Sequence, residues 1–524
     1  MKLKRLLLVI LSLAAAICML FAFTACGTPY DDKGNGGVVT PGEGSEEDDT
    51  DETASKGIEL AINSDGESYS VIGIGTCEDT DIVLPSKYKG KPVTMIGDEA
   101  FLGCEFKSVK IPDSVTVIGE QAFRACDGLT SITIPGSVTE IGEQAFCVCR
   151  NLAEITIFGN KTVIGEGAFR ACYSLTSATI GNGVSAIGEY AFDSCGSLTT
   201  ITIPASVTVI GEGAFCFCED LETITVDPEN PVYHSQGNCI IETASQTLIA
   251  GCNNSVIPSD GSVTVIGSSA FSYCQRLTDI GIPDCVTEIG NYAFLVCISL
   301  ESVEIPASVT AIGEGAFNFC DSLETIIVNP ENPVYHSQGN CIIETASQTL
   351  IAGCNNSVIP SDGSVTVIGS SAFSYCKGLT SIEIPASVTE IGNYAFLFCV
   401  SLESINIPAS VTVIGEGAFR ACDSLKSIEL PDSVTEIGSY AFSICAGLES
   451  IKIPASVTMI GDYAFHSCSS LTEIDFSGTK EQWNLIAKGA FWDCDYDDNS
   501  DETLHVQRSY TVRCTNGNIE INQD

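Results

Sequence analysis

The residues most able to do chemistry in this sequence are its 26 cysteines. Fifteen of them stand three residues after the phenylalanine of an Ala-Phe pair, from Cys104 to Cys494. In an oxidising compartment this suggests disulfides, because stacked strands about 4.8 Å apart bring equivalent alpha carbons within bridging distance. An odd number of equivalent positions whose side chains point the same way cannot pair uniformly, however. The pattern therefore favours buried free thiols that serve as small hydrophobic side chains.

Two close cysteine pairs, Cys147 with Cys149 and Cys216 with Cys218, raise zinc as an alternative. A structural zinc site needs two such pairs or nearby histidines, and one cysteine of each pair already belongs to the periodic set. The sequence has four histidines, and two of them are copies within a duplicated block: His234, His336, His466 and His505. Metalloprotease, nucleophile-elbow, Walker and dinucleotide motifs do not occur. We therefore expect no metal, no cofactor and no enzymatic activity.

Carboxylates dominate the charge, and the formal net charge is −44. Several recur at one position of a repeat, directly after glycine: Glu120, Glu143, Glu166, Glu189, Glu212 and Glu314. Such periodic carboxylates are typical of a solvated face and not of an acid/base pair. Nucleic acids and anionic lipids bind surfaces rich in lysine and arginine, so this charge excludes general affinity for either.

A repeat of 23 residues must position these side chains. Ten of the fourteen intervals between successive Ala-Phe phenylalanines, from Phe101 to Phe491, have this length. Such periodicity is the signature of an array in which each unit is one small supersecondary element. One unit cannot bury its apolar side alone, so the units must stack and share a continuous core.

The segment 129–146, LTSITIPGSVTEIGEQAF, shows what each position of a unit does. The alternation around Ile132 and Ile134 predicts a short strand with both isoleucines facing inward. Pro135 should end the strand, because proline cannot donate a ladder hydrogen bond. We expect Gly142 to supply a positive backbone angle at the next corner and Phe146 to close the coil.

In the form LxxIxIPxSVTxIGxxAFxxC, the repeat resembles the BspA-like leucine-rich-repeat family of bacterial surface proteins. The resemblance covers roughly residue 58 to the end. It implies a right-handed, β-rich leucine-rich-repeat solenoid with parallel strand stacks and short 3-10 or irregular corners. Two units depart from the pattern, at 158–160 (FGN) and 181–183 (GNG), which predicts locally altered corners within the same fold.

Two intervals of 56 residues contain a nearly identical block, residues 230–257 and 332–359. Residues 239–242 and 247–250 have strand character around a polar turn, which predicts a hairpin-like extension joined to an extra coil. Each block also carries two aromatic residues that are candidates for binding, although packing against the adjacent coil is the favoured interpretation: Tyr233, His234, Tyr335 and His336.

The N-terminus predicts export. Basic residues and an apolar run precede Phe23-Thr24-Ala25-Cys26, so residues 1–25 resemble a lipoprotein signal peptide and Cys26 is the expected lipidation site. An uncleaved membrane anchor is the alternative. We expect an acidic tether over 26–56, an N-terminal cap over 57–92, a solenoid over 93–495 with insertions at about 227–262 and 329–364, and a C-terminal cap over 496–524.

The solvent side of the strand row is the predicted binding surface, because repeat solenoids expose a broad sheet face. Its outward candidates are polar and partly acidic: Ser131, Thr133, Glu154, Thr156, Thr200, Thr202, Glu222, Glu301, Glu304, Glu383, Glu403 and Glu429. The family resemblance implies adhesion to an extracellular protein or another surface macromolecule by a lipid-anchored monomer on the extracellular side of the bacterial envelope. A structural envelope lipoprotein without a ligand is the main alternative, and an envelope hydrolase is the weakest one.

Overall fold

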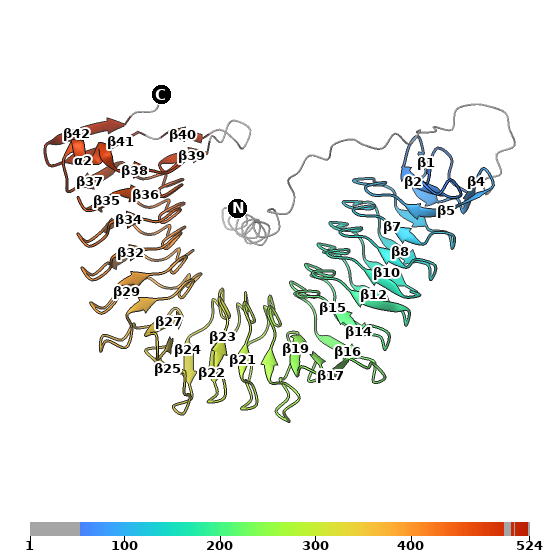
Figure 1. Cartoon of the computed structure of the whole chain (residues 1–524), viewed down its shortest axis with the longest axis horizontal. Helices are drawn as coiled ribbons and strands as arrows, with labels where there is room; N and C mark the ends of the chain where they lie inside the picture. Colours follow the sequence, from blue (N-terminus) through green and yellow to red (C-terminus); the bar gives the residue numbers. More distant parts are fainter. Residues whose placement is uncertain (1–52, 497–504, 508, 522–524) are drawn as a thin grey trace. The chain divides into compact units, whose positions relative to one another are not determined.

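The computed structural model describes residues 53–496, 505–507 and 509–521. The predicted signal peptide, Cys26 and most of the predicted tether lie outside the described residues. Within them the chain is a solenoid of stacked coils, as the repeat predicts (Figure 1). No helix in these ranges has the length and apolarity that a membrane crossing requires.

Each regular coil contributes two short strands. In the coil at 129–146 these are β8 (Ser131–Ile134) and β9 (Glu140–Ile141). Ile132 and Ile134 are buried while Ser131 and Thr133 are exposed, so the predicted alternation is confirmed. The strand ends directly before Pro135, also as predicted. The corners between strands are turns, and the described residues contain no 3-10 helix.

Equivalent strands of successive coils pair in parallel and form two stacks. The first stack contains β3 (Asp81–Val83), β6 (Ser108–Lys110), β8, β10 (Glu154–Ile157), β12 (Ser177–Ile180), β14 (Thr200–Ile203), β16 (Thr223–Val226), β22 (Ser302–Ile305), β24 (Thr325–Val328), β29 (Ser381–Glu383), β31 (Ser404–Asn406), β33 (Ser427–Glu429), β35 (Ser450–Ile453) and β37 (Glu473–Phe476). The second contains β5 (Lys91–Ile96), β7 (Val117–Ile118), β9, β11 (Thr162–Ile164), β13 (Val184–Ile187), β15 (Val209–Ile210), β20 (Val265–Ile266), β21 (Glu288–Ile289), β23 (Ala311–Ile312), β28 (Val367–Ile368), β30 (Glu390–Ile391), β32 (Val413–Ile414), β34 (Glu436–Ile437), β36 (Met459–Ile460) and β38 (Ala487–Lys488).

The Ala-Phe corner forms a third column of contacts. The rings of Phe123, Phe146 and Phe169 stack with centroids 4.9 and 5.2 Å apart and nearly parallel planes. The backbone N–H of most of these phenylalanines donates to the alanine carbonyl of the next coil, as Phe123 does to Ala145 at 2.7 Å, and that of Phe465 donates to the Trp492 carbonyl. This column therefore joins successive coils through both aromatic packing and backbone hydrogen bonds.

The prediction for Gly142 is wrong. Positive φ angles occur at Gln144 and Val148, whereas the φ of Gly142 is not positive. A Cβ on Gly142 would lie 2.6 Å from the carbonyl carbon of Gly119 in the preceding coil. Glycine is needed here because two backbones approach closely, and the left-handed residues of the turn lie two and six positions later.

The two duplicated blocks break both stacks. Strands are confirmed at β18 (Cys239–Glu242) and β19 (Thr247–Ala250), and a third strand, β17 (Tyr233–Gln236), extends the predicted hairpin. The second block repeats this arrangement in β25 (Tyr335–Gln338), β26 (Cys341–Glu344) and β27 (Thr349–Ala352). The buried residues consequently separate into three clusters, with boundaries at the two blocks.

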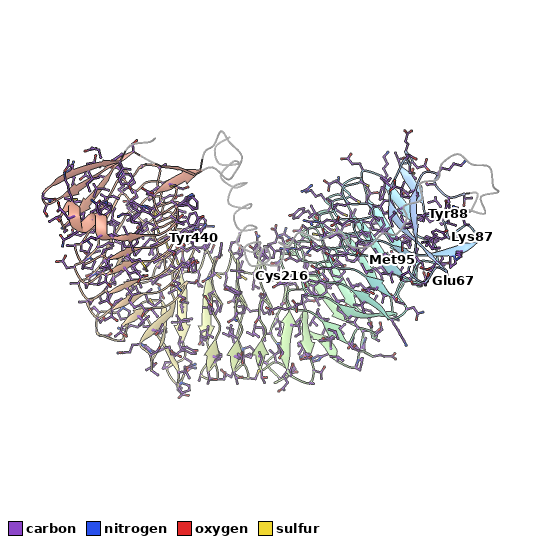
Figure 2. The ribbon with its side chains drawn as sticks, turned by 45° about the horizontal axis from the view of Figure 1, so that its top comes forward. Glu67, Lys87, Tyr88, Met95, Cys216 and Tyr440 are labelled. Carbon is purple, nitrogen blue, oxygen red and sulfur yellow. The ribbon has the colours of Figure 1, made fainter. Side chains whose placement is uncertain are left out.

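Both ends of the described solenoid are closed by antiparallel strands. At the N-terminal end these are β1 (Glu59–Ile62), β2 (Tyr69–Gly73) and β4 (Lys87–Tyr88), where Glu67, Lys87 and Tyr88 lie (Figure 2). At the other end, helix α2 (Lys480–Leu485) buries Trp483, and the remaining strands follow it: β39 (Cys494–Tyr496), β40 (His505–Gln507), β41 (Tyr510–Cys514) and β42 (Gly517–Ile521). At each end the antiparallel strands extend one of the two stacks, and β3 and β38 are the terminal strands of the other stack.

Candidate binding surface

The predicted outward residues of the strand stack are exposed, except that Thr156 is half-buried. The structure brings some of them together: Ser131 pairs in register with Glu154, and Thr133 with Thr156. The outward residues lie in three groups of coils, which the two insertions separate. They do not converge on one pocket. The first group precedes β17, the second contains Glu301 and Glu304, and the third begins at Glu383.

In the first group, five consecutive coils carry threonine at the same outward position. Thr133, Thr156 and Thr179 are register partners across β8, β10 and β12, and Thr202 and Thr225 are partners across β14 and β16. The hydroxyls of Thr202 and Thr225 are 2.8 Å apart. We call these five residues the threonine face.

The outward row beside the threonine face is nearly as uniform, because four of its five members carry hydroxyls: Ser131, Glu154, Ser177, Thr200 and Thr223. The corresponding central positions in the last group of coils carry charge or an amide instead, as in Glu383, Asn406, Glu429, Lys452 and Asp475. One stack therefore presents two chemically different surfaces.

The outward candidates predicted from the sequence did not include Phe158. Phe158 follows Glu154 and Thr156 in the alternation of β10, so its side chain points outward, and it is 60% exposed. The same position holds a buried proline, Pro135, in the preceding coil and Gly181 in the next. A Cβ on Gly181 would lie 2.3 Å from the Phe158 carbonyl oxygen, so glycine is required there and leaves one side of the ring open.

The altered corners that the FGN and GNG segments predict are present. Gly159 has a φ of +67°, and the register between β11 and β13 shifts at Thr162 and Val163. Thr162 is fully buried, and its hydroxyl donates to the Val138 carbonyl of the preceding coil at about 2.5 Å. The sequence therefore does mark Phe158, because phenylalanine stands there in place of the usual proline of the repeat. The exposure of its side chain, however, depends on this local change of the corner.

The aromatic residues of the insertions do not form a surface. Tyr233 and Tyr335 are each 5% exposed, which removes both from the predicted binding set. Their hydroxyl oxygens accept hydrogen bonds from the backbone N–H groups of Ile210 and Ile312, at 3.0 and 3.1 Å. The favoured interpretation, packing against the adjacent coil, is what the structure shows.

The insertion histidines are half-buried. Nδ1 of His234 and the hydroxyl of Thr243 are 2.9 Å apart, and His336 and Thr345 repeat this contact at 2.9 Å. Each contact joins two strand segments of the same block, so these histidines hold the insertion together and only part of each ring reaches solvent.

Most of the periodic cysteines lie in the core, and Cys104, Cys320 and Cys494 are half-buried. The thiols of Cys149, Cys172 and Cys195 donate to the carbonyls of Phe123, Phe146 and Phe169, at 3.1, 3.3 and 3.3 Å. Burial raises the pKa of the Cys149 and Cys172 thiols well above the usual range. Thiolates are the nucleophilic and metal-binding form, so these side chains are held in the form that does neither. Among the described residues no group of three or more histidine, cysteine or acidic side chains has an arrangement that could hold a metal ion.

Among the described residues two aspartates, Asp193 and Asp493, are buried and depart from the pattern of solvated acids. Asp193 is buried directly after the corner phenylalanine Phe192, where its Oδ2 accepts from Nε of Arg170 at 3.0 Å and from the Ser194 hydroxyl at 3.2 Å. Desolvation raises the pKa of Asp193 to about 6, and the Arg170 guanidinium opposes that rise. The carboxylate is buried and held by Arg170 and Ser194, so we assign this ion pair a structural role.

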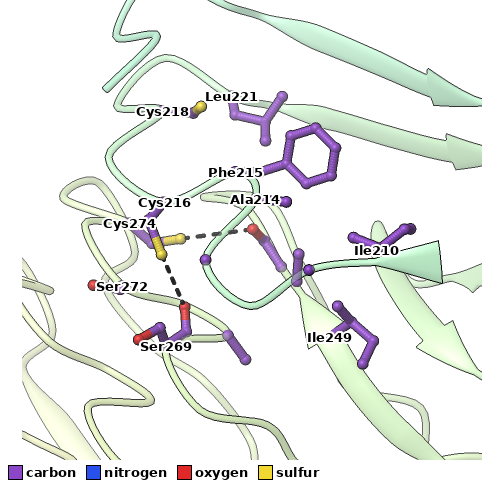
Figure 3. Close-up of a pocket in the computed structure, with 15 residues that line it drawn as sticks. Ile210, Ala214, Phe215, Cys216, Cys218, Leu221, Ile249, Ser269, Ser272 and Cys274 are labelled. Carbon is purple, nitrogen blue, oxygen red and sulfur yellow. Dashed lines mark hydrogen bonds between the residues drawn. The ribbon is translucent and has the colours of Figure 1, made fainter. Parts of the chain in front are cut away.

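A small hollow marks the junction of the first insertion with the coil before it (Figure 3). Its lining is apolar apart from thiols and hydroxyls, and includes Ile210, Phe215, Cys216, Ile249 and Cys274. The Cys216 thiol donates to the Ser269 carbonyl at 3.7 Å, and the Cys274 thiol to the Gly251 carbonyl at 3.9 Å. The lining has no charged side chain that could orient a ligand, so the hollow is a packing defect at the seam.

The repeat at the centre of this geometry is a known one. A model of the BspA-type leucine-rich repeat region matches residues 94–222, 242–362, 344–472 and 389–499. The chain belongs to the BspA-type leucine-rich repeat family. The matched residues contain most of both strand stacks and the Ala-Phe column, and the gap between the first two ranges falls at the first insertion.

Solved structures of other leucine-rich repeat proteins are similar to this BspA-type chain. A leucine-rich cell surface protein from Faecalibacterium prausnitzii is 29% identical, covering 85% of this chain and 98% of that chain with a TM-score of 0.44. Leucine-rich repeat proteins from Eubacterium ventriosum (23% identity, 70% and 93%, TM-score 0.46) and Bacteroides ovatus (27%, 83% and 97%, TM-score 0.37) are also similar. A search of curated proteins finds no match.

Proposed function

We propose that this BspA-type chain is a binding protein of the bacterial cell surface, anchored through lipid on Cys26, that presents its strand stack to extracellular macromolecules without catalysing a reaction. The observation that carries the proposal is the outward face of the first stack. Polar side chains there are exposed at equivalent positions of successive coils, while the apolar side chains of the same strands are buried. Such a face offers a long, regular surface of the kind that repeat solenoids use for binding.

The acidic character of the chain refines the proposal. A net charge of −44 favours neutral or basic partners over anionic ones. The same charge makes copies of the chain repel one another, which supports action as a monomer.

The test compares bacteria that carry the full chain with an otherwise identical deletion strain. We expect carriers to adhere better to at least one immobilised surface among matrix proteins, mucin and other bacteria, and globomycin treatment, which blocks lipoprotein signal cleavage, to reduce display of the chain. Equal adherence of both strains to every surface, together with a leaky envelope in the deletion strain, would overturn the proposal in favour of a structural envelope role.

A further inference from the structure

We propose that the threonine face together with Phe158 is a binding site for a neutral polysaccharide, with the Phe158 ring stacked on one sugar. This rests on the proposed function and names the class of ligand for its surface. The threonine face differs in charge from the rest of the chain. The five central residues carry no charge, and the row beside them holds one carboxylate, Glu154, in a protein of net charge −44.

Hydroxyl groups suit carbohydrate because both partners donate and accept hydrogen bonds. Thr133, Thr179, Thr202 and Thr225 are exposed, and Thr156 is half-buried beside Phe158. The strands pair in parallel register within β8, β10 and β12 and within β14 and β16, so the donors and acceptors repeat in each set at about the 4.8 Å separation of neighbouring strands. β12 and β14 are not paired, which divides the face into a row of three threonines and a row of two. A regular row of equivalent groups matches a polymer that also repeats along its length.

Phe158 is the independent second feature. Its ring is 60% exposed on the same outward face as Thr156, two residues earlier in the same strand direction. The Phe158 backbone N–H donates to the Ile134 carbonyl at 3.1 Å, and the Gly181 N–H donates to the Ile157 carbonyl at 2.8 Å, so the strand ladder continues beneath the ring. The backbone that carries the Phe158 ring is therefore hydrogen-bonded to both neighbouring coils. The equivalent position of the next coil, Gly181, has no side chain that could cover the ring.

An exposed ring attracts the C–H groups on the flat face of a sugar, because the face of an aromatic ring carries partial negative charge. The exposed amides of Asn160 and Asn182 lie in the corners that directly follow this position of the two coils and add further donors and acceptors. Aromatic ring, amides and hydroxyls together form a composition suited to neutral carbohydrate.

Other classes of partner fit this face less well. A protein interface has a contiguous apolar centre, whereas here a single ring stands among hydroxyls. Nucleic acids and acidic glycans require clustered lysine and arginine, and Lys161 is the one basic residue in the stretch 151–169. The same surface could meet neutral sugars from plant polysaccharides or from mucin freed of sialic acid, and the experiment separates these sources.

The test uses the full chain, purified in mild detergent, in native gels containing either a β-glucan, a galactomannan, an arabinoxylan or desialylated mucin, with heparin and polygalacturonate as acidic comparators. We expect retardation by at least one neutral polymer and by neither acidic one. Phe158→Ala should weaken retardation about tenfold and Phe158→Trp should retain it, since one stacked ring contributes about 1.4 kcal/mol.

Two further variants keep the test specific. Thr156→Val/Thr179→Val removes two hydroxyls at nearly constant shape and should weaken binding several-fold. Val163→Ala, which shortens an exposed side chain of β11 in the same coil, should change nothing. Retardation by no neutral polymer, or equal retardation of wild type and Phe158→Ala, would overturn the inference. The adherence experiment is independent: carriers that adhere better than the deletion strain, while the purified chain is retarded by no neutral polymer, would leave the proposed function standing and this ligand class refuted.

Discussion

The ring of Tyr394 lies against Gly417 at the equivalent position of the next coil. A Cβ added to Gly417 would come within 2.5 Å of the ring atoms Cδ1 and Cε1. Tyr190 lies against Gly213 and Tyr292 against Gly315 in the same way, with closest approaches of 2.5 and 2.7 Å. Where tyrosine follows tyrosine instead, the rings stack, as Tyr440 and Tyr463 do with centroids 4.9 Å apart. Tyr440 lies among the C-terminal coils (Figure 2).

This relationship predicts that Gly417→Ala is unusually destabilising. Gly417 has a φ of +55°, so alanine adds backbone strain as well as the clash with Tyr394, and we expect a loss of about 2 to 4 kcal/mol in urea unfolding followed by circular dichroism. Gly103→Ala is the matched control, because Gly103 has a φ of +69° and open space around it, and should lose about 1 to 2 kcal/mol. Combining Gly417→Ala with Tyr394→Ala should cost less than the sum of the single changes, and strict additivity would contradict the contact.

A second prediction concerns Tyr233, whose hydroxyl oxygen accepts the N–H of Ile210 at the last strand of a sheet. Tyr233→Phe leaves this buried N–H without that acceptor and should lower stability by about 1 to 3 kcal/mol. Tyr173→Phe removes a hydroxyl from a tyrosine that is 52% exposed and should be neutral. Hydrogen exchange tests this bond locally. We expect the backbone amides of β15 to exchange faster in Tyr233→Phe than in wild type, and an unchanged rate would argue against the bond from Ile210 to Tyr233.

A third prediction concerns thiol reactivity. Iodoacetamide reacts with thiolates, and burial both covers Cys172 and Cys195 and raises the pKa of each thiol. Among the described cysteines of the folded chain we expect alkylation, mapped by mass spectrometry, first at the half-buried ones: Cys77, Cys104, Cys285, Cys320, Cys494 and Cys514. In urea the core cysteines should react at comparable rates. Rapid labelling of Cys172 in the folded chain would show that its coil opens readily.

A fourth prediction follows from the raised pKa of Asp193, about 6 against the usual 3.8. A carboxyl whose pKa is higher in the folded state favours folding below pH 3.8 and loses that contribution as pH rises through about 6. Relative to wild type, Asp193→Asn should therefore become more stable as pH increases from about 4 to 7, by up to about 3 kcal/mol. Loss of the Arg170 partner shifts the whole curve down without changing this direction. A difference between the two proteins that does not depend on pH would refute the shift.

The repeat made most of the fold predictable. Alternation around Ile132 and Ile134 defined the strand, and the strand character of 239–242 and 247–250 matched β18 and β19 to the residue. These strands depend on side chains that are near one another in sequence, so a period-two pattern of apolar residues is enough to predict them.

The missed features depend on contacts between coils. The reason for Gly142 lies in Gly119, 23 residues earlier, and the burial of Asp193 depends on Arg170 in the preceding coil. The exposure of Phe158 needs Gly181 in the following coil. The helix α2 was also missed, although its capping box at Thr479 and Gln482 is a recognisable local signal.

The strand β18 belongs to two cores at once. Ile240 packs into the cluster before it, while Cys239 and Ile241 pack into the cluster after it, and Ile342, Cys341 and Ile343 repeat this division in the second insertion. Under a force applied at its two ends, the chain would thus carry the load through three hydrophobic cores in series, which meet at β18 and β26. We expect it to unfold in discrete steps, with the least stable core unfolding first and the unfolding of one core stopping at the strand that it shares with the next.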